Sequence, residues 1–167
     1  MTSTTPLPHE SRLNQALRAL FHSQRVAALG TLDADGKPFV SMVPFAVDTQ
    51  AATLVIHVSL LAPHTRNLLS NPAVSVMVMQ PEVPGEPVHA LPRVSLEGLA
   101  RRPLPDSPEG QSARQAYLTR FPEAEPMTHL GDFSFVQITL GSARHVAGFG
   151  TARPVDVDDL ASVLRPR

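Results

Sequence analysis

The chain has 167 residues, with fourteen lysines and arginines against fifteen acidic residues and no cysteine. This length predicts one domain whose core needs no disulfide, and the absence of cysteine excludes thiolate metal sites and cysteine nucleophiles. The balanced charge lacks the basic footprint of nucleic-acid-binding proteins. The N-terminus has no signal-peptide core and the apolar runs are too short to span a bilayer. We therefore expect a cytoplasmic protein with neither nucleic-acid nor membrane partners.

The first predicted elements are a helix and a β-hairpin. Apolar residues over 13–21 recur at the three- and four-residue spacing of an amphipathic helix, and Ser11 suits its N-cap position. A strand over 25–31, a turn at 33–36 and a return strand over 38–47 follow. The Asp35-Gly36 pair favours a hairpin turn.

A strand over 53–59 that runs into a short helix is the most informative part of the sequence. Pro63 suits the first position of a helix, and Asn71-Pro72 ends it. A helix start has free N–H groups and partial positive charge, so polar side chains gathered there are typical of a phosphate site. These side chains are Ser59, His64, Thr65, Arg66 and Asn67. The alternative is a polar connection between two strands that binds nothing.

Most of the remaining chain is predicted to form strands. Strands over 73–79 and 93–101 flank a proline-rich loop at 80–92, and Gly98 indicates a bulge or a close backbone approach. A helix begins after Ser107, strands over 133–140 and 143–149 pair around a turn, and Asp156 caps a last helix. This order predicts a mainly β (α+β) fold, a six- or seven-stranded antiparallel barrel with peripheral helices.

Three segments give the chain a resemblance to a known family. They are 30–45, 57–72 and 131–150, the last containing the run Ala143-Arg-His-Val-Ala-Gly-Phe-Gly150, and the strand at 93–98 adds to them. Together they resemble the FMN-binding split-barrel family related to pyridoxamine 5′-phosphate oxidase, and most closely its haem-utilisation branch. The resemblance implies a split barrel as a single domain over 1–167, with its core at 10–153 and a C-terminal helix at 154–167. It also implies a homodimer with FMN at the interface.

The resemblance further implies which residues bind FMN. The phosphate would contact Ser59, Thr65, Arg66 and Asn67. Many relatives have a lysine where this chain has Asn67, so one positive charge is absent. His64 lies in the same turn and is either a phosphate donor or a surface residue. Backbone groups of the return strand would face the flavin ring, at Val40, Ser41, Met42 and Val43.

The 143–150 segment supplies candidates for binding a substrate or haem. They are Arg144, His145 and Phe149. A neutral imidazole is a competent iron ligand, whereas the alternative for His145 is a polar residue on a solvated strand face. The histidines do not show the His-x-x-x-His spacing of a metal site, so none is expected.

We therefore expect an FMN-dependent oxidoreductase acting on an unidentified small molecule, in which the isoalloxazine carries the redox chemistry. Oxidation of vitamin B6 is not expected, because the chain has no tryptophan and the true oxidases of the family carry one near the C-terminus. The first alternative is a haem-utilisation protein that binds or degrades haem. The second is a non-catalytic flavin-binding module.

Overall fold

The computed structural model describes residues 10–166, which form one sheet of eight strands. The strands are β1 (Val26–Leu32), β2 (Pro38–Pro44), β3 (Ala46–Asp48), β4 (Thr53–Ser59), β5 (Ala73–Met79), β6 (Arg93–Arg101), β7 (Phe133–Val146) and β8 (Ala152–Val155). Seven follow the order β2-β1-β5-β6-β7-β4-β3, and β8 pairs with β7 off this path. All pairings are antiparallel, as predicted.

Four α-helices accompany the sheet. They are α1 (Arg12–Ser23), α2 (Pro63–Ser70), α3 (Pro108–Arg120) and α4 (Val157–Leu164), with 3₁₀ turns at Val88–Ala90 and Pro122–His129. Ser11, Ser107 and Asp156 accept the capping hydrogen bonds of α1, α3 and α4, as their residue types predict. No helix within residues 10–166 has the length and apolar character needed to cross a bilayer.

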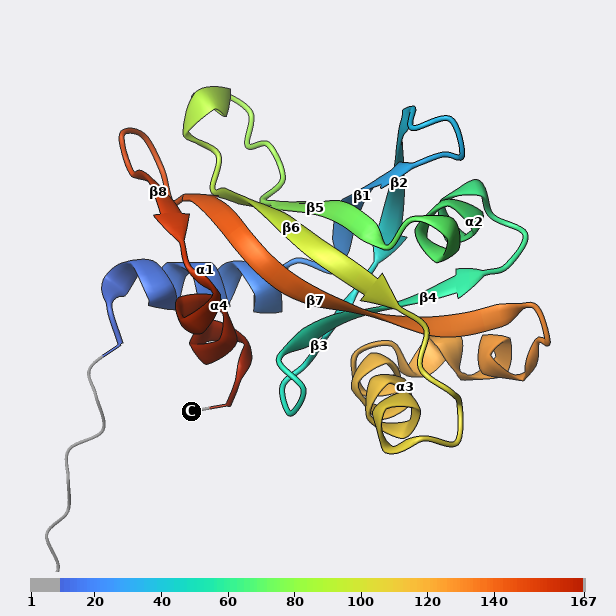
Figure 1. The fold of residues 1–167 in the computed structure, drawn as a ribbon. Coiled ribbons are helices and arrows are strands. Elements are labelled where there is room, and N and C mark those ends of the chain that lie inside the picture. The colour runs from blue at the N-terminus through green and yellow to red at the C-terminus, as the bar shows by residue number, and fades with distance from the viewer. Residues whose placement is uncertain (1–9, 167) are drawn as a thin grey trace, which may run out of the picture.

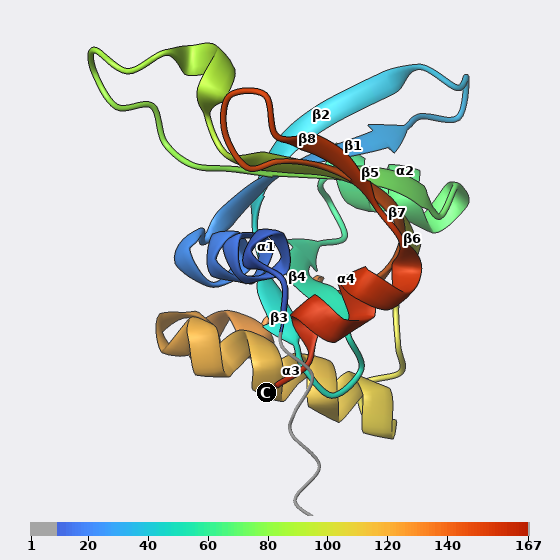
Figure 2. The same ribbon diagram turned by 90° about the vertical axis from the view of Figure 1, so that its left-hand side faces the viewer.

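The sheet curls into a split barrel whose open side is filled by helices (Figures 1 and 2). The chain passes from β2 to β3 through the single residue Phe45, so the two ends of the strand order are joined covalently. Helices α1 and α4 lie across the open side (Figure 2). The predicted antiparallel split barrel with peripheral helices is confirmed, and β8 is a strand that the prediction did not contain.

The main core fills the barrel interior. Helix α1 contributes Leu17, Leu20 and Phe21, and α4 contributes Leu160 and Leu164, all at most 1% exposed. Burying one such side chain stabilises the fold by about 1.5–3 kcal/mol, so the two helices are part of the core and contribute to its stability.

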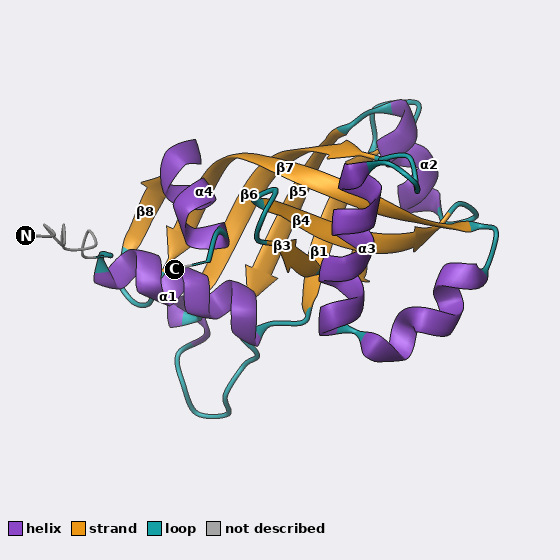
Figure 3. Ribbon diagram, turned by 90° about the horizontal axis from the view of Figure 1, so that it is seen from below, coloured by secondary structure: helices purple, strands orange, loops and turns teal. Residues whose placement is uncertain are grey.

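A second apolar cluster lies outside the barrel, between the sheet and α3. Val55 on β4 packs there with Tyr117 and Phe121, and Phe135 on β7 borders the cluster. Helix α3 lies against β3 and β4 in Figure 3. Strand β4 is therefore buried on both faces, which explains the consecutive apolar residues Leu54, Val55 and Ile56 within it.

The structure differs from the sequence prediction at the predicted turn in 141–142. Strand β7 runs unbroken from Phe133 to Val146 and pairs with β6 on both sides of a register shift. Gly141 and Ser142 lie opposite the single residue Glu97 and so form a bulge. The Ser142 hydroxyl donates to Glu97 Oε2 at 2.7 Å, which ties the bulge to β6.

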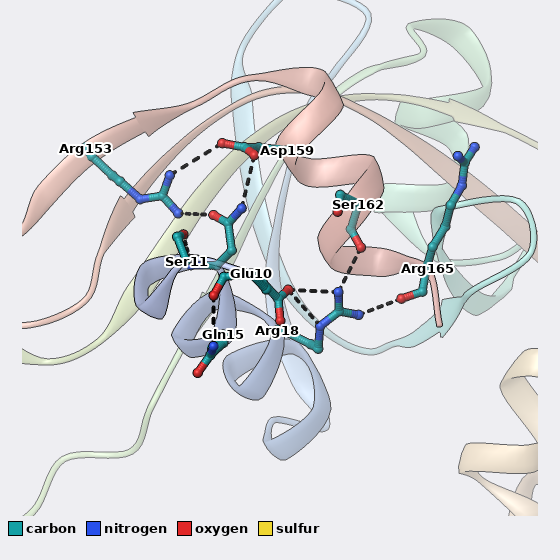
Figure 4. A network of polar contacts seen from close by, with 9 residues as sticks. Glu10, Ser11, Gln15, Arg18, Arg153, Asp159, Ser162 and Arg165 are labelled. Carbon is teal, nitrogen blue, oxygen red and sulfur yellow. Dashed lines mark hydrogen bonds and ion pairs between the residues drawn. The ribbon is translucent and has the colours of Figure 1, made fainter. Parts of the chain in front are cut away.

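Two arginines connect the beginning of the described chain to its end (Figure 4). Arg18 on α1 pairs with Glu10 at 2.9 Å, and it also donates to the Ser162 and Arg165 carbonyl oxygens. Arg153 on β8 donates to the Asn14 side chain. These contacts hold α1 against α4 and β8.

Candidate ligand-binding site

The predicted junction between strand and helix is formed by β4 and α2. Strand β4 ends at Ser59, and α2 begins at Pro63 with no side-chain cap on its N-terminus. The Ala62 amide donates to the Ser59 carbonyl oxygen at 3.1 Å, which shapes the tight turn between them. The predicted strand and helix are thus both present.

Ser59 is occupied by a partner that the sequence reasoning missed. Its hydroxyl donates to Asp132 Oδ2 at 2.8 Å, and the Leu60 amide donates to the Asp132 carbonyl oxygen. This arrangement places a carboxylate where the resemblance implies a phosphate. Asp132 immediately precedes the strand that pairs with β4, and this long-range pairing is what brings it to Ser59.

The four polar residues at the start of α2 point in different directions. Arg66 is exposed and donates to the Leu61 carbonyl oxygen at 3.2 Å. Thr65 is fully buried, and its hydroxyl has no hydrogen-bond partner. Asn67 donates from Nδ2 to Thr31 Oγ1 at 3.0 Å, which binds α2 to β1. His64 is half-buried, and burial lowers its pKa, so its imidazole is neutral at pH 7.

The β2 residues predicted to face a flavin ring lie on an edge strand. Strand β2 pairs only with β1 among the described residues, so its other edge offers free backbone groups. Val40 and Met42 are 68% and 65% exposed, whereas Val43 points into the core. The Ser41 hydroxyl is buried without a partner. The Val43 side chain is therefore not available to a ligand on the outer face.

The outer face of the barrel carries two hollows along β1 and β5. One, of about 640 Å³, is bordered by Gly30, Ser75, Gly98 and Leu99. The other, of about 340 Å³, is bordered by Val40, Met42, Met77 and Met79. Ligand pockets commonly measure about 300–1,000 Å³ and are mostly apolar. Glu97 is the one charged residue bordering either hollow, so a flat, apolar ligand fits them better than a polar one.

The residues proposed for substrate or haem do not form one site. Successive residues of a strand point to opposite faces, so Arg144 is exposed while His145 is only 1% exposed. Burial lowers the pKa of His145, and the nearby Arg153 lowers it further. Phe149 lies between β7 and β8 and is 86% exposed. As the side chain is placed, His145 cannot reach a ligand on the outer face, which corrects its grouping with Arg144.

The donor set at the junction fits a phosphate less well than the resemblance implies. Arg66 is the one exposed cation of α2. The other three predicted donors are not free to bind a phosphate: the Ser59 hydroxyl donates to a carboxylate, the Thr65 hydroxyl is buried and the Asn67 amide donates to Thr31. Within residues 10–166 no three histidine or carboxylate side chains come close enough to hold a metal ion.

Comparisons with known proteins agree with the fold, and several of the relatives found are named as haem proteins. Residues 13–147 match the family described as Pyridoxamine 5′-phosphate oxidase. The chain is 31% identical to the haem oxygenase HutZ of Vibrio cholerae over 93% of this chain and 88% of that protein. It is 36% identical to the chloroplastic non-canonical haem oxygenase HOZ of Arabidopsis thaliana, over 71% of this chain and 34% of HOZ.

A solved structure extends the comparison. A haem-binding protein from Mycobacterium smegmatis superimposes with a TM-score of 0.81 at 28% identity, covering 92% of this chain and 62% of that one. The chain thus spans less than two thirds of some relatives. The match to the family over most of the chain nevertheless settles its membership: this protein belongs to the pyridoxamine 5′-phosphate oxidase-like split-barrel family, among relatives that include haem-utilisation proteins.

Proposed function

We propose that this protein binds haem on the outer face of its barrel and acts in haem utilisation. The observation that carries the proposal is the apolar hollow of about 640 Å³ on that face, in a chain related to the haem oxygenase HutZ. The hollow has the size and lining that a flat, largely apolar macrocycle needs. This reading is better supported than the FMN oxidoreductase that we expected from the sequence.

His64 is the residue of α2 that would hold the haem iron. Helix α2 packs against β1, β2 and β6, three strands that border the large hollow, although His64 itself is outside its lining. Because burial keeps the His64 imidazole neutral, a nitrogen lone pair is available to iron. His145, by contrast, is enclosed in the protein interior.

Haem titration followed by absorbance tests both parts. The wild type should bind one haem per chain, and His64→Ala should shift the Soret band and weaken binding by about tenfold or more. His145→Ala is the matched control and should leave the spectrum unchanged. Absence of haem binding by the wild type contradicts the function, whereas unchanged binding by His64→Ala contradicts only the ligand assignment.

The apolar outer face also supports a homodimer. Val40, Met42 and Leu99 are each more than half exposed on it, and large exposed apolar patches usually mark association surfaces. We therefore propose that two copies associate through this face and that the ligand lies at their interface.

Sedimentation tests the dimer. Met42→Asp places a charge in the proposed interface and should shift the protein towards monomer. Leu104→Asp is a matched control, because Leu104 is 76% exposed but lies in the connection between β6 and α3. A monomeric wild type, or equal dissociation by both variants, would count against this interface.

FMN binding is the second candidate. The free edge of β2 and the exposed guanidinium of Arg66 are the features that favour it, and a bound FMN would supply redox chemistry through its ring. Fluorescence titration of FMN with wild type and Arg66→Ala measures it directly: the proposal requires saturable binding that the variant weakens.

A further inference from the structure

A small pocket lies on the opposite side of β4 from the barrel interior, beneath the first half of α3. Its volume is about 140 Å³. Strands β4 and β7, the connection after β6 and helix α3 all contribute to it, with His57, Arg102, Arg114, Thr128, Phe133 and Phe135 carrying its chemistry. It shares no residue with the two hollows on the outer face, so it is a separate feature of the molecule.

The walls of this pocket are flat rings. The His57 imidazole stacks on Phe135 with the ring centroids 4.4 Å apart, and Phe133 lies 5.0 Å from His57. Tyr117, which is the one tyrosine of the chain, closes the cluster at 5.6 Å from His57. Aromatic rings prefer stacked or edge-to-face neighbours at these separations, so a further planar ring suits the pocket.

His57 carries a polar atom that the protein leaves without a partner. The residue is 8% exposed, and its Nδ1 is buried with no hydrogen bond. Burial lowers the pKa of His57, and Arg114 lowers it further, so the ring is neutral at pH 7. Buried polar atoms are nearly always hydrogen-bonded in native proteins, and an unpaired one costs about 1–3 kcal/mol. A ligand in the pocket can supply the missing partner.

Two guanidinium groups give the pocket a positive charge. Arg114 donates to Thr128 Oγ1 at 3.0 Å and lies 3.6 Å from Glu125 Oε1. Glu125 also lies 2.8 Å from His129 Nε2, so its carboxylate is shared between Arg114 and His129. Within residues 10–166 Arg102 forms no hydrogen bond or ion pair. A guanidinium group can donate two parallel hydrogen bonds to the two oxygens of a carboxylate. The Arg102 guanidinium is therefore available to bind the carboxylate of a ligand.

We propose that this pocket binds one small planar aromatic carboxylate. The ring would lie against Phe133 and Phe135, and the carboxylate would accept hydrogen bonds from His57 Nδ1 and from Arg114 or Arg102. The size agrees, because an engineered cavity of about 150 Å³ is known to hold benzene. A purely structural role predicts instead that His57 acts only as a packed ring and that added ligands do not enter.

Benzoate serves as the probe, and isothermal titration calorimetry measures its binding to the full chain. Nuclear magnetic resonance of the Tyr117 ring provides a second readout, because this ring packs 5.6 Å from the His57 imidazole. His57→Phe keeps an aromatic ring but removes Nδ1, and Arg114→Gln removes one guanidinium. Arg25→Gln is the matched control: Arg25 also pairs with a glutamate of the 3₁₀ segment, Glu123, at 2.9 Å but does not border the pocket.

The proposal requires one saturable benzoate site in the wild type, with the Tyr117 signals shifting in parallel. Binding should weaken by about tenfold or more in His57→Phe and in Arg114→Gln, and stay unchanged in Arg25→Gln. His57→Phe should unfold no more easily than the wild type, since it removes an unpaired polar atom. Absence of benzoate binding, equal binding by all four proteins, or competition by inorganic phosphate as effective as benzoate itself would each overturn the proposal.

Discussion

Replacing Thr65 by valine should stabilise the protein. Thr65 is 0% exposed, and its Oγ1 has no hydrogen-bond partner. Valine keeps the β-branched shape, so helix propensity changes little, while the unpaired hydroxyl, which costs about 1–3 kcal/mol, is removed. We expect the free energy of unfolding to rise by about 1–2 kcal/mol, which corresponds to about 3–6 °C in Tm for a chain of this size.

Urea unfolding and thermal scans of matched variants measure this effect. Thr31→Val is the control: Thr31 is equally enclosed, at 2% exposed, but its hydroxyl accepts from Asn67 at 3.0 Å, so the same substitution should destabilise the fold by about 1 kcal/mol. Thr65→Val should also leave FMN affinity unchanged. A loss of stability equal to that of Thr31→Val would refute the reasoning, and a loss of FMN affinity would restore Thr65 as a phosphate contact.

Three further predictions concern the bulge, the junction and the interior. Gly98→Ala would place a Cβ 2.6 Å from Ile138 Cγ2, so we expect the free energy of unfolding measured in urea to fall by about 1–3 kcal/mol. Gly131→Ala is the control and should be near neutral, because a Cβ there has nothing within 4 Å. Equal effects of the two substitutions would contradict the bulge packing. Asp132→Asn removes the carboxylate at the junction and should tighten FMN binding by about tenfold in fluorescence titration, and unchanged affinity would mean that this charge does not oppose phosphate. Because the folded state lowers the pKa of His145, the unfolded state binds more protons there, and the free energy of unfolding should fall as the pH drops below about 6.5. His145→Asn should weaken this pH dependence in unfolding curves recorded across that range. If the pH dependence of the variant equals that of the wild type, the protons bind to other groups.

Much of the fold could be predicted because local signals and tertiary packing agree. The bounds of β4, β5 and β6 match the predicted strands, since Pro63 and the Asn71-Pro72 pair mark where regular structure changes. The prediction failed where a local signal was ambiguous. Gly141-Ser142 is compatible with either a turn or a bulge, and the pairing of β7 with β6 along its whole length decides for the bulge.

The candidate site was less predictable, because its character depends on contacts between distant segments. The sequence placed Ser59 and Arg66 in one junction, and they are there. It could not show that Asp132, 73 residues away, accepts a hydrogen bond from Ser59. Nor could adjacency reveal that His145 faces the interior while its neighbour Arg144 faces outwards, since that depends on which face of β7 the barrel encloses.

The arginine contacts between α1 and α4 have a consequence for how the fold opens. Segments near the ends of a fold often open at low free energy, but here Arg18 reaches the Ser162 and Arg165 carbonyl oxygens, so detaching either helix breaks these hydrogen bonds. We therefore expect α1 and α4 to open together as a single cooperative unit. Opening this unit would expose the Leu17 and Leu160 side chains together.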